Sequence, residues 1–187
     1  TNLPDFRYRS NEISIFAAPG EYEPATFSIY AMTELKDVTV EAGVLKGVTK
    51  NIPAPSVDIR VVKCWYQGGH PNRPGDVKFL NPELLLKDDD FLRIDTEKLT
   101  NILKSPEAPR DADELHPVTI PVDTQKQFWV TVHVPEDALP GNYQGVIRIE
   151  TADGGSARIK LALDVLPIIL AEPMLEYMIY YGAGRLD

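Results

Sequence analysis

The sequence contains few of the residues from which metal and cofactor sites are usually built. It has one cysteine, Cys64, and three histidines among its 187 residues. A single cysteine excludes a disulfide within the chain and any metal site made from several cysteines. His70, His116 and His133 form no pair with the sequence spacing of zinc ligands. We therefore expect neither a metal nor a cofactor.

Positive charge is also scarce. The chain has 19 lysines and arginines against 28 aspartates and glutamates, which gives a formal net charge of −9. It lacks a dense basic cluster that would release counterions from a phosphate backbone or bind an anionic membrane surface. No apolar run approaches the roughly 20 residues that are needed to span a bilayer. We therefore expect no nucleic-acid partner and no membrane insertion.

A secretory signal is absent as well. Thr1 opens the chain in place of methionine, and no charged segment followed by an apolar segment comes after it. We interpret this as the loss of an upstream segment, such as a signal peptide, through processing or through the choice of chain boundaries. The expected location is secreted, periplasmic or at the cell surface.

The sequence does contain a succession of short alternating segments. Hydrophobic residues make up 43% of the chain, which is enough for a core, and 16 prolines and 12 glycines recur between short apolar runs. Because an alternation with a period of two gives a strand one apolar face, such strands must pair their apolar faces. We predict an all-β fold, an antiparallel two-sheet β-sandwich of the immunoglobulin or jelly-roll type with eight to ten strands. The alternating segments are 13–17, 27–31, 38–42, 57–61, 128–134, 147–149 and 159–165.

Two turns near the end of the chain have recognisable chemistry. The run L-P-G-N-Y, from Leu139 to Tyr143, enters a late strand and predicts a tyrosine corner. In such a corner Tyr143 buries its ring and returns its hydroxyl group to nearby backbone. The run A-D-G-G at 152–155 predicts a hairpin turn. We expect the last three strands to form a meander.

The middle of the chain is less regular. Residues 67–82 are rich in glycine, proline and asparagine and predict a long loop, and residues 105–117 predict a second one. Between them, apolar residues at helical spacing predict one short helix at 96–104. We expect at most this one helix in the fold.

Four longer motifs occur in a fixed order along the chain. They are G-E-Y-E-P-A-T-F-S-I-Y-A at 20–31, V-D-I-R-V-V-K-C-W-Y-Q at 57–67, L-N-P-E-L-L-L-K-D-D-D at 80–90 and L-P-G-N-Y-Q-G-V-I-R-I at 139–149. Together they resemble the N-terminal β-sandwich of large bacterial proteins related to glycoside hydrolase family 123, whose relatives often carry domains of unknown function. The resemblance extends over most of the chain, from about residue 12 to residue 173.

The resemblance implies that catalysis belongs to another domain. In such proteins a (β/α)-barrel follows the sandwich, and an adjacent Asp-Glu pair assists hydrolysis by the substrate's own acetamido group. In this chain the one Asp-Glu step is Asp113-Glu114, in a polar loop bounded by prolines. That position does not match the end of a barrel strand, so we assign no catalytic residue.

The end of the chain resembles a domain boundary. Residues 166–173, L-P-I-I-L-A-E-P, resemble a linker, and residues 175–182, L-E-Y-M-I-Y-Y-G, resemble the first strand of a following domain. We therefore expect a sandwich domain at 1–166, and a linker with the start of a barrel domain at 167–187. Tyr177, Tyr180 and Tyr181 would then belong to the core of that next domain.

Aromatic residues are the candidates for a binding site. Sugar rings stack their apolar faces on exposed aromatic side chains, while nearby polar groups bind the hydroxyls. Trp65 and Tyr66, just before the predicted long loop, are one candidate platform. Trp129, which shares a strand face with Thr131 and His133, is the second. The same residues fit packing against a neighbouring domain, which is the preferred interpretation for Trp65 and Tyr66.

Other reactive residue types have plainer interpretations. Asp88, Asp89 and Asp90 have the oxygen ligands that calcium prefers, yet they lack the glycine-punctuated spacing of a calcium-binding loop. We interpret them as a solvated connection between strands. Cys64 lies inside a strand pattern with no nucleophile elbow, and is interpreted as an inert buried thiol.

These observations favour a non-catalytic accessory domain of a multidomain glycoside hydrolase-like protein. Its expected partner is the adjacent catalytic domain of the same polypeptide, which it would support or whose cleft it would shape. Three alternatives stay open. A carbohydrate-binding module predicts an exposed aromatic platform and sugar affinity. An adhesion or cell-surface interaction domain predicts a large apolar or aromatic patch, and a free-standing enzyme predicts paired carboxylates in a cleft.

Overall fold

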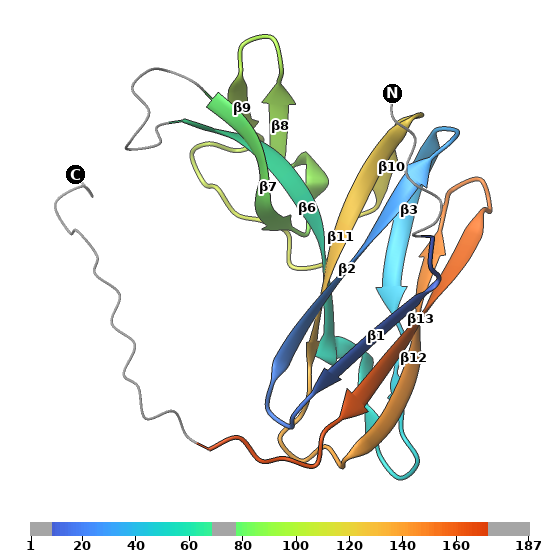
Figure 1. Ribbon diagram of the computed structural model, residues 1–187. Helices are drawn as coiled ribbons and strands as arrows, with labels where there is room; N and C mark the ends of the chain where they lie inside the picture. The colour runs from blue at the N-terminus through green and yellow to red at the C-terminus, as the bar shows by residue number, and fades with distance from the viewer. Residues whose placement is uncertain (1–8, 69–77, 172–187) are drawn as a thin grey trace, which may run out of the picture.

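Strands dominate the structure of the protein, a computed structural model that describes residues 9–68 and 78–171. Among these residues the helices are two single-turn 3-10 helices, η2 and η3, and neither is long and apolar enough to cross a membrane. The elements in chain order (Figure 1) are β1 (Glu12–Ala17), β2 (Tyr22–Ala31), β3 (Leu35–Ala42), β4 (Leu45–Lys46), β5 (Asn51–Ile52), η2 (Ala54–Ser56), β6 (Val57–Gly68), β7 (Lys78–Leu86), η3 (Asp89–Phe91), β8 (Leu92–Asp95), β9 (Thr100–Leu103), β10 (Val118–Ile120), β11 (Thr124–His133), β12 (Gly141–Glu150) and β13 (Ser156–Val165).

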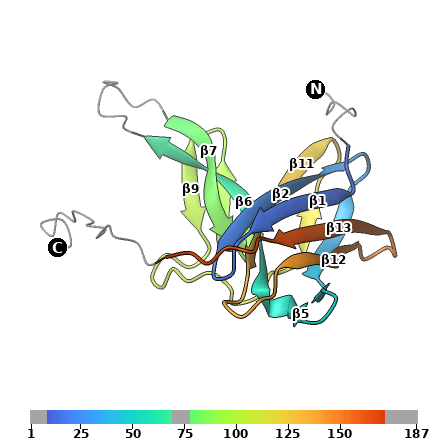
Figure 2. The same ribbon diagram turned by 60° about the horizontal axis from the view of Figure 1, so that its bottom comes forward.

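Two sheets pack face to face and enclose the core (Figure 1; Figure 2). The seven-stranded sheet has the order β1-β13-β12-β3-β10, with β4 beside β12 and β5 beside β4. The four-stranded sheet has the order β2-β11-β6-β7. Neighbouring strands are antiparallel throughout these two sheets, except that β1 and β13 run parallel. The predicted all-β, antiparallel two-sheet β-sandwich is confirmed, with this parallel pair as an addition.

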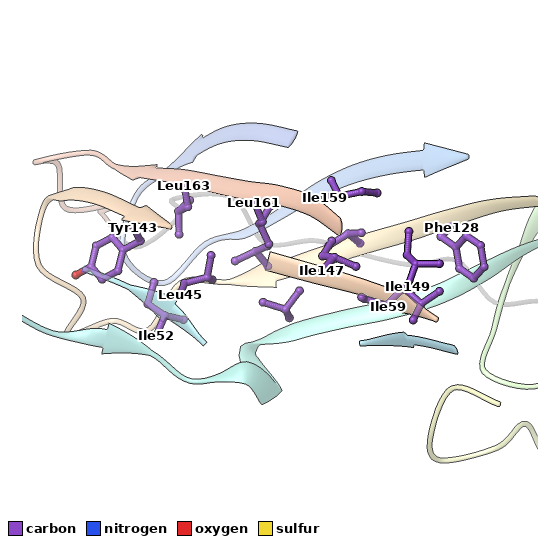
Figure 3. Close-up of a cluster of buried hydrophobic side chains, with 14 of the residues drawn as sticks. Leu45, Ile52, Ile59, Phe128, Tyr143, Ile147, Ile149, Ile159, Leu161 and Leu163 are labelled. Atoms are coloured by element: carbon purple, nitrogen blue, oxygen red, sulfur yellow. The ribbon is translucent and has the colours of Figure 1, made fainter. Parts of the chain in front are cut away.

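The core lies between the two sheets. Figure 3 shows Ile147 of β12 and Leu161 of β13 pointing into the same interior as Ile59 of β6 and Phe128 of β11. Ile147 and Phe128 are fully buried. Each such side chain stabilises the fold by roughly 1.5–3 kcal/mol through burial alone. Because side chains alternate along a strand, the residues between them point outward and form the surfaces of the sandwich.

The tyrosine corner predicted from the L-P-G-N-Y run is confirmed. Tyr143 is 3% exposed. Its hydroxyl oxygen accepts a hydrogen bond from the Leu139 backbone N–H at 3.1 Å, and the hydroxyl donates to the Leu139 carbonyl at 2.9 Å. The neighbouring backbone is tightly packed, since a Cβ atom on Gly47 would stand 2.6 Å from Cε1 of Tyr143. The corner is therefore held both by hydrogen bonds and by close packing.

The predicted meander of the last three strands is only partly correct. β12 and β13 form the expected hairpin, whose turn includes Gly154 with a φ of 87°. β11, however, pairs with β2 and β6 in the other sheet. Its connection to β12 contains Pro135 and Pro140, which have no N–H to continue a ladder. The chain crosses between the sheets there, and alternation alone does not reveal such a crossing because both sheets use the same core.

The long loop predicted for residues 67–82 is shorter than expected. β6 continues into this range and β7 begins inside it, with Gln67 paired to Phe79. Pro82 lies beside a register shift between β6 and β7, the kind of irregular position at which a strand tolerates proline. The composition typical of a loop therefore concealed the ends of two strands. Residues 69–77, which include His70, lie outside the described residues.

The helix predicted at 96–104 is wrong. β9 occupies residues 100–103 and pairs with β8. The turn before it contains Leu99 with a φ of 52°, a left-handed conformation through which a right-handed helix does not continue. Hairpin pairing also satisfies backbone groups that a short isolated helix would leave without stable partners. The second predicted loop, 105–117, contains no strand or helix, as expected.

β6 and β7 extend beyond the sandwich and form what we call the arm (residues 62–68, 78–85 and the β8–β9 hairpin). β6 pairs with β11 over Val57–Val61, and beyond that point its described partner is β7. Figure 1 shows β7, β8 and β9 standing away from the packed sheets. The side chain of Asn101 in β9 holds the arm together, because it accepts from the N–H of Tyr66 at 2.8 Å and donates to its carbonyl at 2.7 Å.

Candidate functional site

The outward-facing surface of the four-stranded sheet carries the candidate site, which we call the outer face. In β11 the buried residues Phe128, Val130 and Val132 point into the core, so Trp129 and Thr131 point the other way. Strand register places Trp129 between Arg60 of β6 and Thr26 of β2, and it places Thr131 opposite Asp58. The members of the outer face are Tyr22, Thr26, Asp58, Arg60, Trp129, Thr131 and His133.

Trp129 lies near the middle of the outer face. Its indole is half-buried, and Nε1 donates a hydrogen bond to Oγ1 of Thr131 at 3.2 Å. This bond satisfies the one polar atom of the indole and turns its nitrogen-bearing edge along β11. The remaining ring surface is apolar. The geometry provides a half-buried aromatic surface bordered by hydrogen-bonding side chains.

A charged pair borders the indole on the β6 side. Nε of Arg60 donates to Oδ2 of Asp58 at 2.6 Å, and Nζ of Lys87 donates to Oδ1 of the same carboxylate. Burial acts to raise the pKa of Asp58, but the hydrogen bonds from Lys87 and Arg60 outweigh it, so the pKa lies below its ordinary value. Asp58 is therefore a carboxylate at neutral pH, which suits it to accept hydrogen bonds and not to act as a general acid.

Two aromatic side chains stack at the end of the outer face where β2 begins and β11 ends. Tyr22 and His133 are partners in the β2–β11 ladder, and their rings stack with centroids 4.4 Å apart and planes 18° from parallel. Tyr22 is 67% exposed. His133, a predicted site residue, therefore lies on the same face as Trp129, four residues along the strand.

The other predicted platform is divided between two faces. Trp65 and Tyr66 are consecutive in β6, so their side chains point to opposite sides of the arm. Tyr66 continues the face that carries Arg60, whereas Trp65 points to the other side, where Nε1 donates to Glu83 at 3.4 Å. The two residues do not form a single platform. The structure instead brings Trp129 and His133 together with Arg60.

Asp58, Arg60 and Tyr22 were not selected as site residues from the sequence. Asp58 and Arg60 were visible as the polar side of an alternating strand. Their position beside Trp129 depends on the pairing of β6 with β11, in which the paired residues are more than 60 positions apart in sequence. A local pattern cannot supply that pairing.

The acidic run at 88–90 is occupied by the protein's own cations. Oδ2 of Asp88 accepts from Nζ of Lys104 at 2.9 Å, and Oδ1 accepts from the backbone N–H of Asp90 at 2.9 Å. Burial acts to raise the pKa of Asp88, but these hydrogen bonds lower it overall. No group of three or more metal-ligating side chains is present in residues 9–68 and 78–171.

Asp89 fixes the root of the arm. Its carboxylate accepts from Lys63 of β6 at 3.1 Å and from Lys126 of β11 at 2.8 Å. Lys63 also donates to the Asp89 backbone carbonyl at 2.6 Å. Because β6 and β11 separate just beyond Val61, one carboxylate bridges the fork between them. The interpretation of this run as a solvated connection is therefore wrong for Asp89, whose side chain is 18% exposed.

The Asp-Glu step and Cys64 are the other reactive side chains that the sequence singled out. Asp113 is exposed and pairs with Arg110 at 2.9 Å, while Glu114 follows it in the same loop. Cys64 is half-buried beside the register shift in the arm, which differs from the full burial expected.

An open groove of about 790 Å³ lies at the base of the sandwich. Its walls come from the turn after β1, the connection before β12 and the segment after β13, at residues 19–20, 136–140 and 166–170. Figure 2 brings this end of the molecule forward. Ile168, Ile169 and Leu170 are 50%, 96% and 51% exposed, so exposed apolar side chains border the groove, whose lining also includes the acidic Glu136 and Asp137. The backbone N–H of Gly20, which lines the groove, donates to the carbonyl of Val134, the residue that follows β11.

Comparison with known proteins identifies the fold and not the activity. No protein-family model and no curated protein matches the sequence. The chain is similar to part of a family 123 glycoside hydrolase from Clostridium perfringens, a structure concerned with glycolipid glycan hydrolysis, with a TM-score of 0.64 and 13% identity. That match covers 87% of this chain and 24% of the glycoside hydrolase, so this chain spans about a quarter of that enzyme's length. A PapD-like domain of human CEP192 gives a TM-score of 0.37 at 12% identity, covering 86% of this chain and 84% of that domain.

Proposed function

We propose that this β-sandwich is a non-catalytic accessory domain of a larger glycoside hydrolase-like protein, in which it supports the neighbouring catalytic domain and shapes one side of its cleft. The observation that carries the proposal is the extent of the structural match. Nearly the whole sandwich aligns with about a quarter of an enzyme of glycolipid glycan hydrolysis. Most of such an enzyme, with room for a barrel of about 200 residues or more, then belongs to other domains.

The state of three carboxylates, Asp58, Asp88 and Asp89, supports a non-catalytic role for them. A glycosidase acid needs a raised pKa so that it holds a proton at working pH. Asp58 and Asp88 have lowered pKa values because cationic side chains bind them against the opposing effect of burial. Asp89 is enclosed between two lysines. These acids stabilise the sandwich and the root of the arm.

The base groove is the surface we assign to the neighbouring domain. The segment that follows β13 lines it and leads the chain away from the sandwich. Ile169 and Leu170 border the groove as exposed apolar side chains, and exposed apolar patches of this kind mark interaction surfaces. A domain linked directly to this segment would cover them at little further cost in chain entropy.

The first test is to read the complete gene that encodes the chain. The reading frame is expected to continue into a catalytic domain, and the chain alone is expected not to hydrolyse chromogenic N-acetylhexosaminides. A frame without such a domain, or hydrolysis by the isolated chain, would refute the proposal.

The second test uses the full-length protein and a matched pair of substitutions. Ile168→Asp places a charge in the base groove, and Val122→Asp places one at the opposite end of β2, where exposure is nearly equal at 52% against 50%. Thermal unfolding is expected to change from one cooperative transition to two in Ile168→Asp and to stay single in Val122→Asp. Equal behaviour of the two variants would show that the groove holds no domain.

A further inference from the structure

The outer face has a composition that differs from an ordinary solvated sheet surface. A half-buried indole is surrounded by two hydroxyl side chains, a guanidinium group and a carboxylate on three adjacent strands. Neighbouring strands lie about 4.8 Å apart, and alternate residues along one strand lie about 7 Å apart. These groups therefore surround the indole within the span of one or two sugar rings.

We propose that the outer face around Trp129 is a binding site for a neutral glycan, in which the indole stacks on a pyranose ring while Arg60, Asp58 and the flanking threonines bind its hydroxyls. The site does not depend on the domain arrangement proposed above. Pyranose rings combine an apolar face with a polar rim, and the outer face presents the complementary arrangement.

The polar groups beside the indole are held in place before a ligand arrives. Arg60 and Asp58 are each 38% exposed and are joined by a hydrogen bond, and Lys87, which is 13% exposed, fixes the second carboxylate oxygen. Nη1 of Arg60 reaches the Leu85 carbonyl at 3.5 Å, while Nη2 has no hydrogen-bond partner among the described residues. A fixed guanidinium with an open donor loses little entropy when it binds a hydroxyl group.

Charge favours a neutral ligand over the other classes. The outer face itself carries one carboxylate, Asp58, and one guanidinium group, Arg60, whose charges cancel, and the neighbouring Lys87 is 13% exposed and bound to Asp58. A phosphate or sulfate group would require more exposed cations. The chain as a whole carries a formal charge of −9, which repels polyanions. A protein partner would favour a contiguous apolar centre, whereas here the residues paired with Trp129 on the two neighbouring strands, Thr26 and Arg60, are both polar.

The direction of the site along β11 indicates where a longer glycan would extend. Tyr22 and His133 stack at the end of the same face where β11 ends. Just beyond them, Val134 is hydrogen-bonded to Gly20, which lines the base groove. A glycan of several units bound at Trp129 would thus run across the Tyr22–His133 pair toward the base groove.

The test is a neutral-glycan array probed with the chain, followed by calorimetric titration of the strongest hit. Trp129→Ala is expected to weaken binding at least about tenfold, because it removes the stacking surface. Trp65→Ala changes the same residue type on the other side of the arm and is expected to bind as the unchanged chain does. Thr26→Arg leaves the core untouched, since Thr26 is exposed, and is expected to block the site by filling the space beside the indole.

Three outcomes would overturn the proposal. They are silence across the array, binding that survives both Trp129→Ala and Thr26→Arg, and binding that Trp65→Ala weakens as much as Trp129→Ala does. Thermal unfolding of each variant is measured alongside. If Trp129→Ala fails to fold, Thr26→Arg decides the result, because loss of binding in that folded variant supports the site and full retention refutes it.

Discussion

Asp89 offers the sharpest test of how the arm is held to the sandwich, through the substitution Asp89→Asn. Its carboxylate binds Lys63 at 3.1 Å and Lys126 at 2.8 Å, and the three side chains are 18%, 15% and 18% exposed. The amide of asparagine has a similar shape but no charge. It leaves two poorly solvated ammonium groups on β6 and β11 without a counter-ion.

The size of the effect follows from this enclosure. A hydrogen bond to a charged group contributes about 1.5–3 kcal/mol, and removal of one partner of a buried ion pair costs about 3–5 kcal/mol. Lys63 keeps its hydrogen bond to the Asp89 carbonyl, and none of the three side chains is fully buried. We therefore expect Asp89→Asn to lower the free energy of unfolding by about 2–4 kcal/mol, which corresponds to a melting temperature lower by about 5–15 °C in a chain of this size.

The assay is urea unfolding followed by tryptophan fluorescence, with Asp113→Asn as the matched control. Asp113 forms an ion pair with Arg110, but the two side chains are 84% and 78% exposed. Water already solvates both charges, so the control is expected to change the free energy of unfolding by less than about 0.5 kcal/mol. Equal effects of the two substitutions would refute the inference that Asp89 bridges the fork between β6 and β11.

Further predictions concern the tyrosine corner, a close backbone contact, pH and calcium. Tyr143→Phe is expected to cost about 1–3 kcal/mol in urea unfolding because two hydrogen bonds are lost, those of the Tyr143 hydroxyl with the backbone N–H and carbonyl of Leu139. Gly47→Ala is expected to cost about 1–3 kcal/mol in the same assay, since the new Cβ atom would stand 2.5 Å from the Lys50 carbonyl oxygen. Asp58 and Asp88 have folded-state pKa values below the ordinary 3.8, so their stabilisation should be complete above that pH and should be lost as the pH falls through the lower folded values, which a series of urea unfolding curves at decreasing pH would measure. Calcium should leave the melting temperature unchanged, because the protein's own cations and backbone already bind the carboxylates of Asp88 and Asp89. A rise in melting temperature on addition of calcium would contradict this expectation.

The layers of the fold could be predicted from the sequence because the signal is local. Alternation at 128–134 and 159–165 gives each strand its buried side, and the L-P-G-N-Y run carries its corner chemistry within five residues. The assignment of strands to sheets could not be predicted, because both sheets contribute to one core. β11 has the alternation of β12 and β13, and only its pairing with β2 and β6 reveals the crossing.

The candidate site shows the same division between local and long-range information. Trp129 and His133 could be selected because they share the polar side of one strand. Arg60 and Asp58 could not be connected with them, since register between β6 and β11 depends on contacts across more than 60 residues. Trp65 and Tyr66 were grouped because they are adjacent in sequence, yet adjacency within a strand separates two side chains onto opposite faces.

The acidic run at 88–90 has a structural role, so a ligand-binding site is more to be expected on the outer face or in the base groove than at the root of the arm. Three consecutive acids attract attention as a metal or catalytic site, but Asp88 and Asp89 are bound by lysines from three separate segments of the chain. The carboxylates of Asp88 and Asp89 therefore position elements of the fold and are already bound by the protein's own cations. By contrast, Nη2 of Arg60 and the side chain of Ile169 lack comparable partners among the described residues. The backbone of Gly20, which lines the groove, is hydrogen-bonded to Val134, the residue after His133, so a glycan that extends along the outer face past His133 would approach a domain that covers the groove.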